Sequence, residues 1–383
     1  MMKLRDACLG ITDGSHNPPN GIDFSNYLML SSKNISNNAI SFDEPRYLSE
    51  IDFAAENKRT RIAPGDVLLT IVGTVGRAAV VKENLPAFTL QRSVAVLHPN
   101  PQICSSEYLM YALQGKQKDI EKRAKGVAQK GVYLSDLAKI DIEIPTLDQQ
   151  NRIVAQMRSL SKIIDCFYGE LRLLENLIKA RFVEMFGDTI LNPFGWDKEL
   201  LGTVCDVRDG THDSPQYYDT GYPLVTSKNV TGGKIDLSDC SLICEADYKK
   251  INERSKVDIG DILMPMIGTI GNPVIVDIEP RFAIKNVSLI KFKPASKVLN
   301  IYIRTLLQSD YFDDAVLGKV RGGTQKFISL GDIRKLEILI PPINIQTDFA
   351  SFVAQVDKSI AAVQQALNKA QLLFDSLMQR YFN

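Results

Sequence analysis

The sequence predicts an α+β fold in which two similar globular modules are joined by two long antiparallel coiled-coil helices, with a pseudo-twofold internal repeat. Three observations support this fold class. The second half of the 383-residue chain repeats the first at a shift of about 195 residues, both halves contain short β-rich runs, and both end in a long heptad pattern. A repeat of this length indicates duplication of a whole module rather than of a short solenoid unit.

The repeat is visible in segments that keep the same order in both halves. The matched pairs are DGSH (13–16) with DGTH (209–212), SSKNI (31–35) with TSKNV (226–230), and PGDVLLTIVGTVG (64–76) with IGDILMPMIGTIG (259–271). The GTVG and GTIG turns suit a hairpin or bulge, because glycine tolerates positive φ.

Each module is expected to combine strands and helices. Short β-rich runs separated by Gly, Pro and Asn lie at 67–72, 78–81 and 94–97, and again at 262–267, 274–277 and 287–292. A helix is expected at about 106–125 and its counterpart at about 299–316, followed by a basic loop and a last strand at 139–144 or 335–340. This mixture predicts an α+β module of about 145 residues.

The stretch after each last strand has a different pattern. Apolar residues alternate at spacings of four and three over four heptads, which indicates a coiled-coil seam, and Arg181 interrupts the first copy. Two matched helices would most simply bury these stripes against each other, although each could fold back on its own module or dimerise with another chain. The expected seam residues are Met157, Leu160, Ile164, Phe167, Leu171, Leu174, Val353, Val356, Ile360, Val363, Leu367 and Phe374.

These patterns divide the chain into four parts. The expected boundaries are 1–146 for the first module, 147–187 for the central helix, 188–342 for the second module and 343–383 for the C-terminal helix.

Composition excludes several classes of protein. The 45 Lys and Arg balance the 45 Asp and Glu, which argues against a uniformly basic nucleic-acid coat. A net charge of zero still permits local basic patches. The N-terminus lacks the apolar stretch of a signal peptide, and the most apolar runs fall short of a membrane span. Six cysteines in so long a chain do not form a disulfide framework, so a reducing, cytoplasmic location is expected.

Motifs of catalysis are mostly missing. The sequence contains no GxxxxGK[ST], HExxH, GxSxG or strand-associated GxGxxG motif, and Cys240 and Cys244 are better explained as small core residues than as metal ligands. The string NPPN at residues 17–20 resembles the base-gripping tetrapeptide of amino-methyltransferases but lacks the aromatic residue that would stack on the base. For His16 and His212, a turn in which Asp caps the backbone and His bonds locally is favoured over an acid–base pair.

Basic clusters beside loops that bear Gly, Gln or Asn recur in both modules. Lys and Arg neutralise phosphates, whereas Gln, Asn and Arg can pair with base edges, so these loops suit DNA recognition. The alternatives are an ordinary solvated face and, for the SKN segments, a simple turn. The candidate DNA-binding residues are Lys33, Asn34, Lys58, Arg59, Arg61, Lys125, Gln129, Lys130, Lys228, Asn229, Lys249, Lys250, Arg321, Thr324, Gln325 and Lys326.

Taken together, these features resemble the DNA-specificity subunit of Type I restriction-modification systems over essentially the whole chain. The resemblance rests on the duplicated module, the PGDVL and GTVG segment, the strands ending in IPT or IPP shortly before Gln150 or Gln346, and the long helix that closes each module. The order LIKARFVEMFGD (177–188) and then NPFGW (192–196) is similar to the family's passage from the central helix to the second module.

The resemblance implies two target recognition domains, each reading half of a split, asymmetric double-stranded DNA site, with the long helices as a ruler between the halves. It implies a chain without catalytic residues, metal or cofactor of its own. The expected partners are two modification (methyltransferase) subunits that bring S-adenosylmethionine, and restriction (motor-nuclease) subunits that use ATP and Mg. A coiled-coil adaptor that binds only protein, and more remotely a DNA methyltransferase, are the alternatives.

Overall fold

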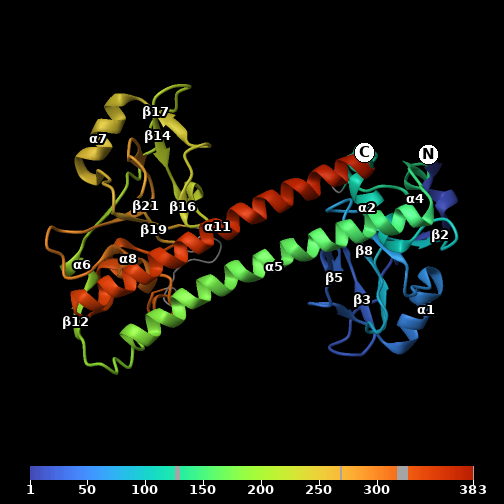
Figure 1. Ribbon diagram of the computed structural model, residues 1–383, viewed down its shortest axis with the longest axis horizontal. Helices are drawn as coiled ribbons and strands as arrows, with labels where there is room; N and C mark the ends of the chain where they lie inside the picture. Colours follow the sequence, from blue (N-terminus) through green and yellow to red (C-terminus); the bar gives the residue numbers. More distant parts are fainter. Residues whose placement is uncertain (126–129, 268–269, 317–326, 383) are drawn as a thin grey trace. The chain divides into compact units, whose positions relative to one another are not determined.

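The computed structural model describes residues 1–125, 130–267, 270–316 and 327–382 (Figure 1). Its elements mix helices and strands throughout, which confirms the predicted α+β class. The chain forms two compact units, Met1–Tyr168 with Gln365–Asn383, and Gly169–Gln364. Each unit thus combines one module with part of both long helices, while the four-part division expected from the sequence stays a prediction.

The first unit is built on a four-stranded antiparallel sheet in the order β2-β10-β7-β8. Its strands are Cys8–Asp13, Val94–Pro99, Val67–Thr70 and Ala78–Val80, and the middle strands VLLT and VAVL are buried on both faces. A second sheet places β3 (Leu28–Leu30) between β6 (Arg46–Tyr47) and a parallel β9 (Phe88–Leu90). Long buried apolar runs therefore form the sheets, as a two-sided core requires.

Short strands and helices complete the first unit. These elements are β1 (Met2–Lys3), η1 (Leu4–Ala7), η2 (Ser32–Asn34), β4 (Ile35–Ser36), β5 (Ala39–Ile40), α1 (Glu50–Thr60), α2 (Ser106–Gly115), α3 (Gln117–Lys122), α4 (Leu134–Leu137) and β11 (Asp141–Ile142). The single helix expected at 106–125 is wrong, because the chain breaks into α2 and α3 at Lys116. Gly115 ends α2 where a side chain would collide with Phe382, so this turn is shaped by the C-terminal helix.

The second unit repeats this arrangement. Its main sheet has the order β13-β21-β18-β19, and its second sheet places β14 between β17 and a parallel β20. The strands are β12 (Asp197–Leu200), β13 (Asp206–Asp209), β14 (Tyr222–Val225), β15 (Val230–Thr231), β16 (Lys234–Ile235), β17 (Ser241–Ile243), β18 (Ile262–Pro265), β19 (Val274–Ile275), β20 (Ala283–Ile284), β21 (Val287–Lys291) and β22 (Glu337–Ile340). The helices are α6 (Leu201–Val204), η3 (Ser227–Asn229), α7 (Glu245–Ser255), α8 (Asn300–Leu306), α9 (Asp310–Ala315) and α10 (Leu330–Arg334).

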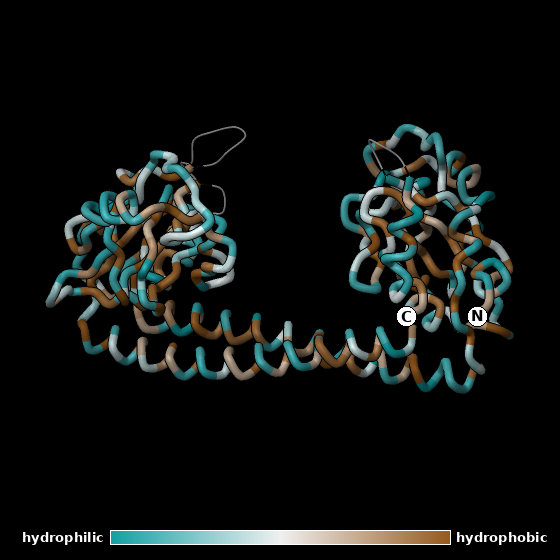
Figure 2. The backbone as a smooth tube through the Cα atoms, turned by 90° about the horizontal axis from the view of Figure 1, so that it is seen from above, coloured by the Kyte–Doolittle hydropathy of each residue, from teal (hydrophilic) through white to brown (hydrophobic). Residues whose placement is uncertain are grey.

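Two helices of 40 residues close the modules, α5 (Leu147–Phe186) and α11 (Ile343–Phe382). In the first unit the start of α5 meets the end of α11, where the Tyr381 hydroxyl donates to Gln156 Oε1 at 2.9 Å. In the second unit the end of α5 meets the start of α11, where the rings of Phe182 and Phe349 lie 5.6 Å apart. The two helices are therefore antiparallel in each unit. Figure 2 shows apolar and polar positions alternating along both of them.

Burial along these helices follows the expected seam. Seven seam positions are buried, namely Met157, Leu160, Ile164, Val353, Val356, Val363 and Leu367, and five are half-buried, namely Phe167, Leu171, Leu174, Ile360 and Phe374. Toward the modules the stripe also joins the globular cores, since Met157 packs in the first core and Val353 in the second. Packing of each helix on a module, which was the alternative expectation, thus occurs together with helix pairing.

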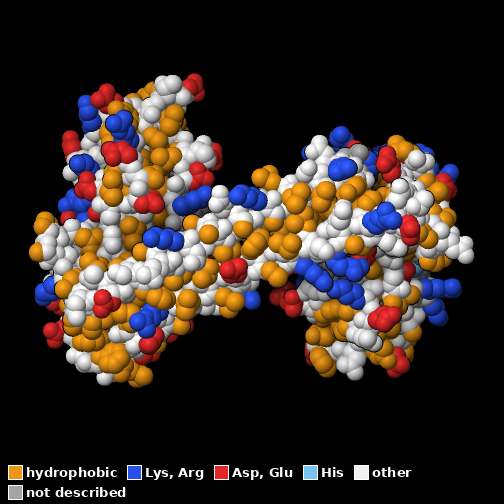
Figure 3. All heavy atoms as spheres, viewed as in Figure 1, with side chains coloured by type: hydrophobic (Ala, Val, Ile, Leu, Met, Phe, Trp, Pro, Cys, Tyr) orange, Lys and Arg blue, Asp and Glu red, His pale blue; other side chains and the backbone are white. Residues whose placement is uncertain are grey.

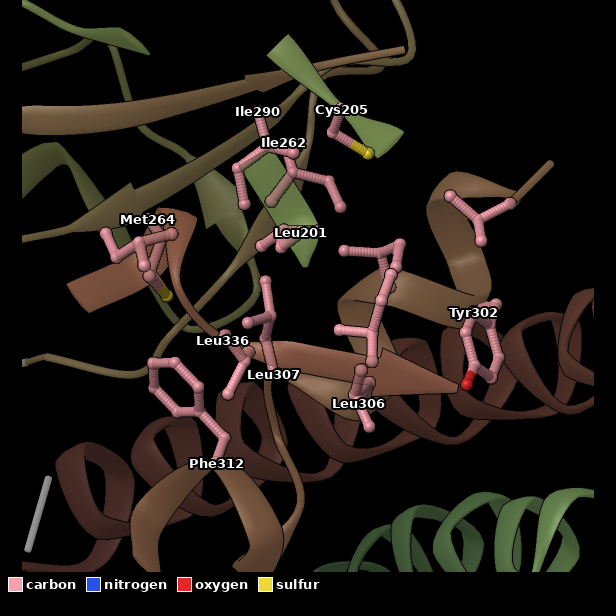
Figure 4. Packing of buried hydrophobic residues seen from close by; sticks show 14 of the residues in the cluster. Leu201, Cys205, Ile262, Met264, Ile290, Tyr302, Leu306, Leu307, Phe312 and Leu336 are labelled. Carbon is pink, nitrogen blue, oxygen red and sulfur yellow. The ribbon is translucent and has the colours of Figure 1, made fainter. Parts of the chain in front are cut away.

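The core of the second unit shows how a helix end and a module share one apolar interior. Tyr302 and Leu306 of α8 pack with Leu201, Ile262 and strand residues of the main sheet in one buried cluster (Figure 4). The same cluster contains Phe182, Phe186 and Phe349 of the long helices, whose rings contact Tyr302 or each other. Aromatic packing of this kind contributes beyond the buried area alone.

Candidate nucleic-acid interface

The two DGSH and DGTH loops follow the ends of β2 and β13. In the first unit, Gly14 N–H donates to Val94 O at 3.2 Å and Ser15 N–H donates to Leu90 O at 2.7 Å. In the second, Gly210 N–H donates to Val287 O at 3.0 Å and Thr211 N–H donates to Ile284 O at 3.0 Å. Both glycines press against backbone atoms of the neighbouring chain segment, where a Cβ would not fit. Glycine is therefore required for the close approach that holds each loop in place.

An arginine from the last turn of a helix completes each loop. In the first unit, Arg59 Nη2 donates to Asp13 Oδ1 at 2.5 Å, and His16 Nε2 lies 2.8 Å from Asp13 Oδ2. The Asp13 side chain is 9% exposed, whereas those of Arg59 and His16 are 53% and 51% exposed. A nearly buried carboxylate thus orients two exposed nitrogen-bearing side chains. We call this group the Asp–His–Arg cluster.

The second unit contains the same cluster with one added contact. Arg254 Nη2 donates to Asp209 Oδ1, and His212 Nε2 lies 2.9 Å from Asp209 Oδ2. In addition, His212 Nδ1 lies 2.8 Å from Asn286 Oδ1. Hydrogen bonds to Asn286 and Asp209 raise the pKa of His212 above its ordinary value, against the opposing effects of burial and of Arg254. Because both ring nitrogens face oxygen acceptors, this geometry favours the doubly protonated imidazolium.

This geometry confirms one part of the expectation for the two histidines and corrects another. Both histidines hydrogen-bond locally, as expected. The aspartates were expected to cap the backbone, and that part is wrong, because their carboxylates accept from arginine and histidine side chains. Arg59 and Arg254 recur at the repeat shift, so the sequence contained a signal for this pairing. What it lacked was any indication that a helix end would reach the loop after β2.

The candidate pairs Lys33-Asn34 and Lys228-Asn229 divide between surface and interior. Lys33 and Lys228 are exposed, and each lies 3.3 Å from an exposed carboxylate, Glu44 or Asp239. Asn34 and Asn229 are buried, and their amides close the capping boxes of η2 and η3.

The two asparagine side chains are buried and bond to their own loops. Asn34 Oδ1 accepts from Ser31 N–H at 3.0 Å, and its Nδ2 donates to Asp43 O at 3.0 Å. Asn229 repeats this with Thr226 N–H at 3.0 Å and Asp236 O at 3.2 Å. As a correction to the sequence-based expectation, Asn34 and Asn229 hold the loops and are not candidates for direct base contact.

The remaining candidates are placed unequally. Lys58, Arg61, Lys130 and Lys250 are exposed, and Lys249 pairs with Glu245 at 2.7 Å. Lys125 pairs with Asp136 at 3.1 Å and lies 6.0 Å from the centre of the Tyr133 ring. Five candidates lie outside the described residues, namely Gln129, Arg321, Thr324, Gln325 and Lys326. On the surface drawn in Figure 3, Lys and Arg side chains are interspersed with Asp and Glu, in keeping with the zero net charge.

Four loops of the first unit meet beside the Asp–His–Arg cluster. Arg92 N–H donates to Ser15 O at 2.8 Å, Ser32 N–H donates to Ser93 Oγ at 3.0 Å, and Ile71 N–H donates to Ser93 O at 2.9 Å. Gly73 N–H reaches Lys130 O at 3.4 Å. We define the loop face as residues 13–16, 31–34, 71–73 and 91–93 together with Lys130. Its exposed cations, Lys33, Arg92 and Lys130, and the adjoining Arg59 suit contacts with a polyanion.

Arg92 is a functional candidate that the sequence pattern missed. The backbone shows that it matches Asn286, since Arg92 N–H donates to Ser15 O and Asn286 N–H donates to the equivalent Thr211 O. In the same way Gln91 matches Lys285, through bonds to Leu30 O and Val225 O. The turn after β9 is one residue longer in the first module than in the second, so the constant repeat shift is broken at this point.

Comparisons with known proteins give matches over most of the chain. A family model described as the Type I restriction modification DNA specificity domain matches residues 24–176 and 193–372. The Type I restriction enzyme MjaVIII specificity subunit of Methanocaldococcus jannaschii is 23% identical over 324 residues, covering 79% of this chain and 75% of its own. The MjaIX specificity subunit of the same organism is 26% identical over 354 residues, covering 84% and 77%.

Solved structures share the fold. The S subunit of a Type-I restriction-modification system from M. genitalium has a TM-score of 0.56 at 13% identity, covering 100% of this chain and 95% of its own. A chain from a study of complex assembly and conformational transition of the type I R-M system has a TM-score of 0.54 at 19% identity, with the same coverage. Across the part of the chain that the structure describes, no helix has the length and apolar character needed to cross a membrane.

Proposed function

The chain belongs to the family of Type I restriction-modification DNA specificity subunits, and on this premise we propose that it reads a bipartite, asymmetric DNA site for its complex. Each module reads one half-site, and the long helices set the number of unread base pairs between them. The chain itself has no catalytic role in this proposal. It acts in the cytoplasm, where it directs the chemistry of its partners to one sequence.

The observation that carries this proposal is the duplication of one loop scaffold with different polar side chains in one turn. Both modules hold the same glycine-anchored loop and the same capping box, so both present their loops in the same way. At matched positions of the turn after β9 or β20, however, the first module has Gln91 and Arg92 and the second has Lys285 and Asn286. A shared scaffold with different polar groups is what two readers of different sequences need, because base edges differ in their donors and acceptors.

The length and continuity of the two long helices support their proposed role as a ruler. Each of the two spans 40 residues without interruption, which corresponds to about 60 Å at 1.5 Å per residue. The first turn of each carries a buried glutamine, Gln150 or Gln346, that bonds to the preceding segments of its own module. A helix anchored in this way transmits a fixed length better than a flexible linker would.

Partner subunits supply what this chain does not. We infer two modification subunits that bind S-adenosylmethionine and flip the target base, and restriction subunits that use ATP and Mg for translocation and cleavage. The relatives named above are specificity subunits, which supports assignment of the chemistry to other chains.

Methylome sequencing tests the proposal. The chain would be co-expressed with its modification subunits in a host that lacks other DNA methyltransferases. We expect one methylated motif with two different half-sites separated by a fixed number of unspecified bases. No motif in the complete system, or methylation by the purified chain alone, would refute the assignment. A motif with two identical half-sites would refute the asymmetric reading.

A further inference from the structure

The Asp–His–Arg cluster recurs in two modules that carry different polar residues in the turn after β9 or β20. Asp13, His16 and Arg59 of the first module match Asp209, His212 and Arg254 of the second in identity and in the contacts that the histidine and the arginine make with the aspartate. A group shared by two readers of different sequences is suited to what both half-sites have in common. In duplex DNA that common part is the sugar-phosphate backbone, which positions a protein without specifying sequence.

The geometry of the cluster suits an anion. The carboxylates of Asp13 and Asp209 are only 9% and 8% exposed and lie inside the loop, whereas the side chains of Arg59 and Arg254 are 53% and 66% exposed. A guanidinium has five N–H donors in a planar fork, and Nη2 is the group directed at the carboxylate. The aspartate therefore orients an arginine whose exposed part can donate to a phosphate oxygen.

The charge of each cluster is maintained in two different ways. In the second module the His212 ring lies between Asp209 Oδ2 and Asn286 Oδ1, so the imidazolium adds a positive charge to that of Arg254. In the first module the position of Asn286 is occupied by Arg92, which is exposed and whose N–H donates to Ser15 O. In the second module Asp209, Arg254 and the His212 imidazolium sum to one positive charge. In the first, Asp13 and Arg59 balance, and the neighbouring Arg92 adds one positive charge.

Resting on the proposed function, we propose that each Asp–His–Arg cluster is a binding site for a DNA backbone phosphate, used in the same way by both modules. Arg59 and Arg254 donate to the phosphate, and Asp13 and Asp209 are positioning residues. Arg92 in the first module and His212 in the second supply the additional charge. Sequence is read by other residues, so losing a cluster weakens binding to all sequences alike.

The test is the salt dependence of DNA binding by the complex of this chain with its modification subunits. Arg59→Gln and Arg254→Gln keep a hydrogen-bond donor near the buried carboxylate but remove the charge. We expect each to lower the affinity by about tenfold. The slope of log affinity against log salt should fall by about 0.9 for each lost phosphate contact, and by about twice that in the double variant. The methylated motif should be unchanged.

Matched controls separate this effect from a general loss of positive charge. Lys3→Gln and Lys297→Gln remove cations that also pair with carboxylates, Asp141 and Glu199, at 2.7 and 2.6 Å. Their carboxylate partners lie on β11 and β12, outside the two clusters. The controls should keep the wild-type slope.

Several outcomes decide the proposal. Folded Arg59→Gln and Arg254→Gln complexes with wild-type affinity and slope would show that the cluster is only a structural ion pair. A changed methylation motif would show that it reads bases. If these variants do not fold, Arg92→Gln and His212→Gln at pH 6 remove the additional charge of each module and leave the arginine on the carboxylate, so each should still lower the salt slope. A wild-type complex that binds all sequences equally would refute the proposed function. The phosphate site would still be tested by comparing the salt dependence of affinity for any duplex between the wild-type complex and the variants.

Discussion

Gln346 connects the start of α11 to its module through three backbone hydrogen bonds. Its side chain is fully buried, and its Oε1 accepts from Leu299 N–H at 2.8 Å. Its Nε2 donates to Lys297 O at 2.9 Å and to Pro341 O at 2.8 Å. Gln150 makes the equivalent set at the start of α5, with Ser105 N–H at 2.9 Å, Ile103 O at 2.8 Å and Pro145 O at 2.9 Å. We expect Gln346→Leu to uncouple helix and module in the second unit.

The magnitude follows from the three bonds. Leucine is similar in size to glutamine, so the change is mainly one of hydrogen bonding rather than of packing. Each net hydrogen bond contributes about 1 kcal/mol, and a buried backbone group left without a partner costs about 1 to 3 kcal/mol. Because one N–H and two carbonyls lose their partner, we expect the free energy of unfolding to fall by about 3 to 5 kcal/mol.

Urea unfolding, followed by tryptophan fluorescence and by circular dichroism, measures this loss of stability and shows that it occurs in the second unit. Trp196 is the single tryptophan of the chain and lies in the second unit, where its Nε1 donates to Phe186 O at 3.2 Å. Its fluorescence reports on that unit, whereas circular dichroism reports on both. Gln346→Leu should move the fluorescence midpoint to lower urea, while Gln150→Leu should move the transition seen by circular dichroism and leave the fluorescence midpoint nearer to wild type.

Asn344→Leu is the matched control, because it removes an exposed amide in the same turn of α11. Its effect should be within about 0.5 kcal/mol. Equal fluorescence midpoints for Gln346→Leu and Asn344→Leu would refute the claim that Gln346 anchors the helix.

Two further predictions concern the ruler and the second cluster. Deleting one heptad from each long helix, residues 165–171 and 364–370, removes about 10 Å of helix. We expect methylome sequencing to show an unread spacer that is shorter by roughly three base pairs, with both half-sites unchanged. An unchanged spacer would show that the helices do not act as a ruler. Hydrogen bonds to Asn286 and Asp209 raise the pKa of His212, against the opposing effects of burial and Arg254, so its imidazolium persists to higher pH than that of an ordinary histidine. Its charge is lost as pH rises through this raised pKa, so DNA affinity of the wild-type complex should fall as pH rises above the range of an ordinary histidine. The part of the fall due to this ring should disappear in His212→Gln, and identical pH profiles would contradict the charge assignment.

Local periodicity explains why much of the fold could be predicted. The heptads after Leu147 and Phe349 depend on residues close in sequence, and the structure has a helix of 40 residues at each place. The break between α2 and α3 could not be seen in this way, because Gly115 is required by Phe382 at the far end of the chain. Helix propensity, which is judged from nearby residues, does not reflect contacts with a residue so far away in the sequence.

The candidate site was likewise predicted in part from the sequence. Recurrence of DGSH and DGTH identified the loops, and composition identified the exposed lysines. The sequence alone therefore determined that one module was duplicated, that long helices close both copies and that basic loops recur. Only the tertiary structure decided that Asn34 and Asn229 are buried caps, that Arg59 and Arg254 reach Asp13 and Asp209, and that Arg92 stands where Asn286 contacts His212. The physical reason is that capping, burial and ion pairing depend on which segments the folded chain brings within about 3 Å of each other.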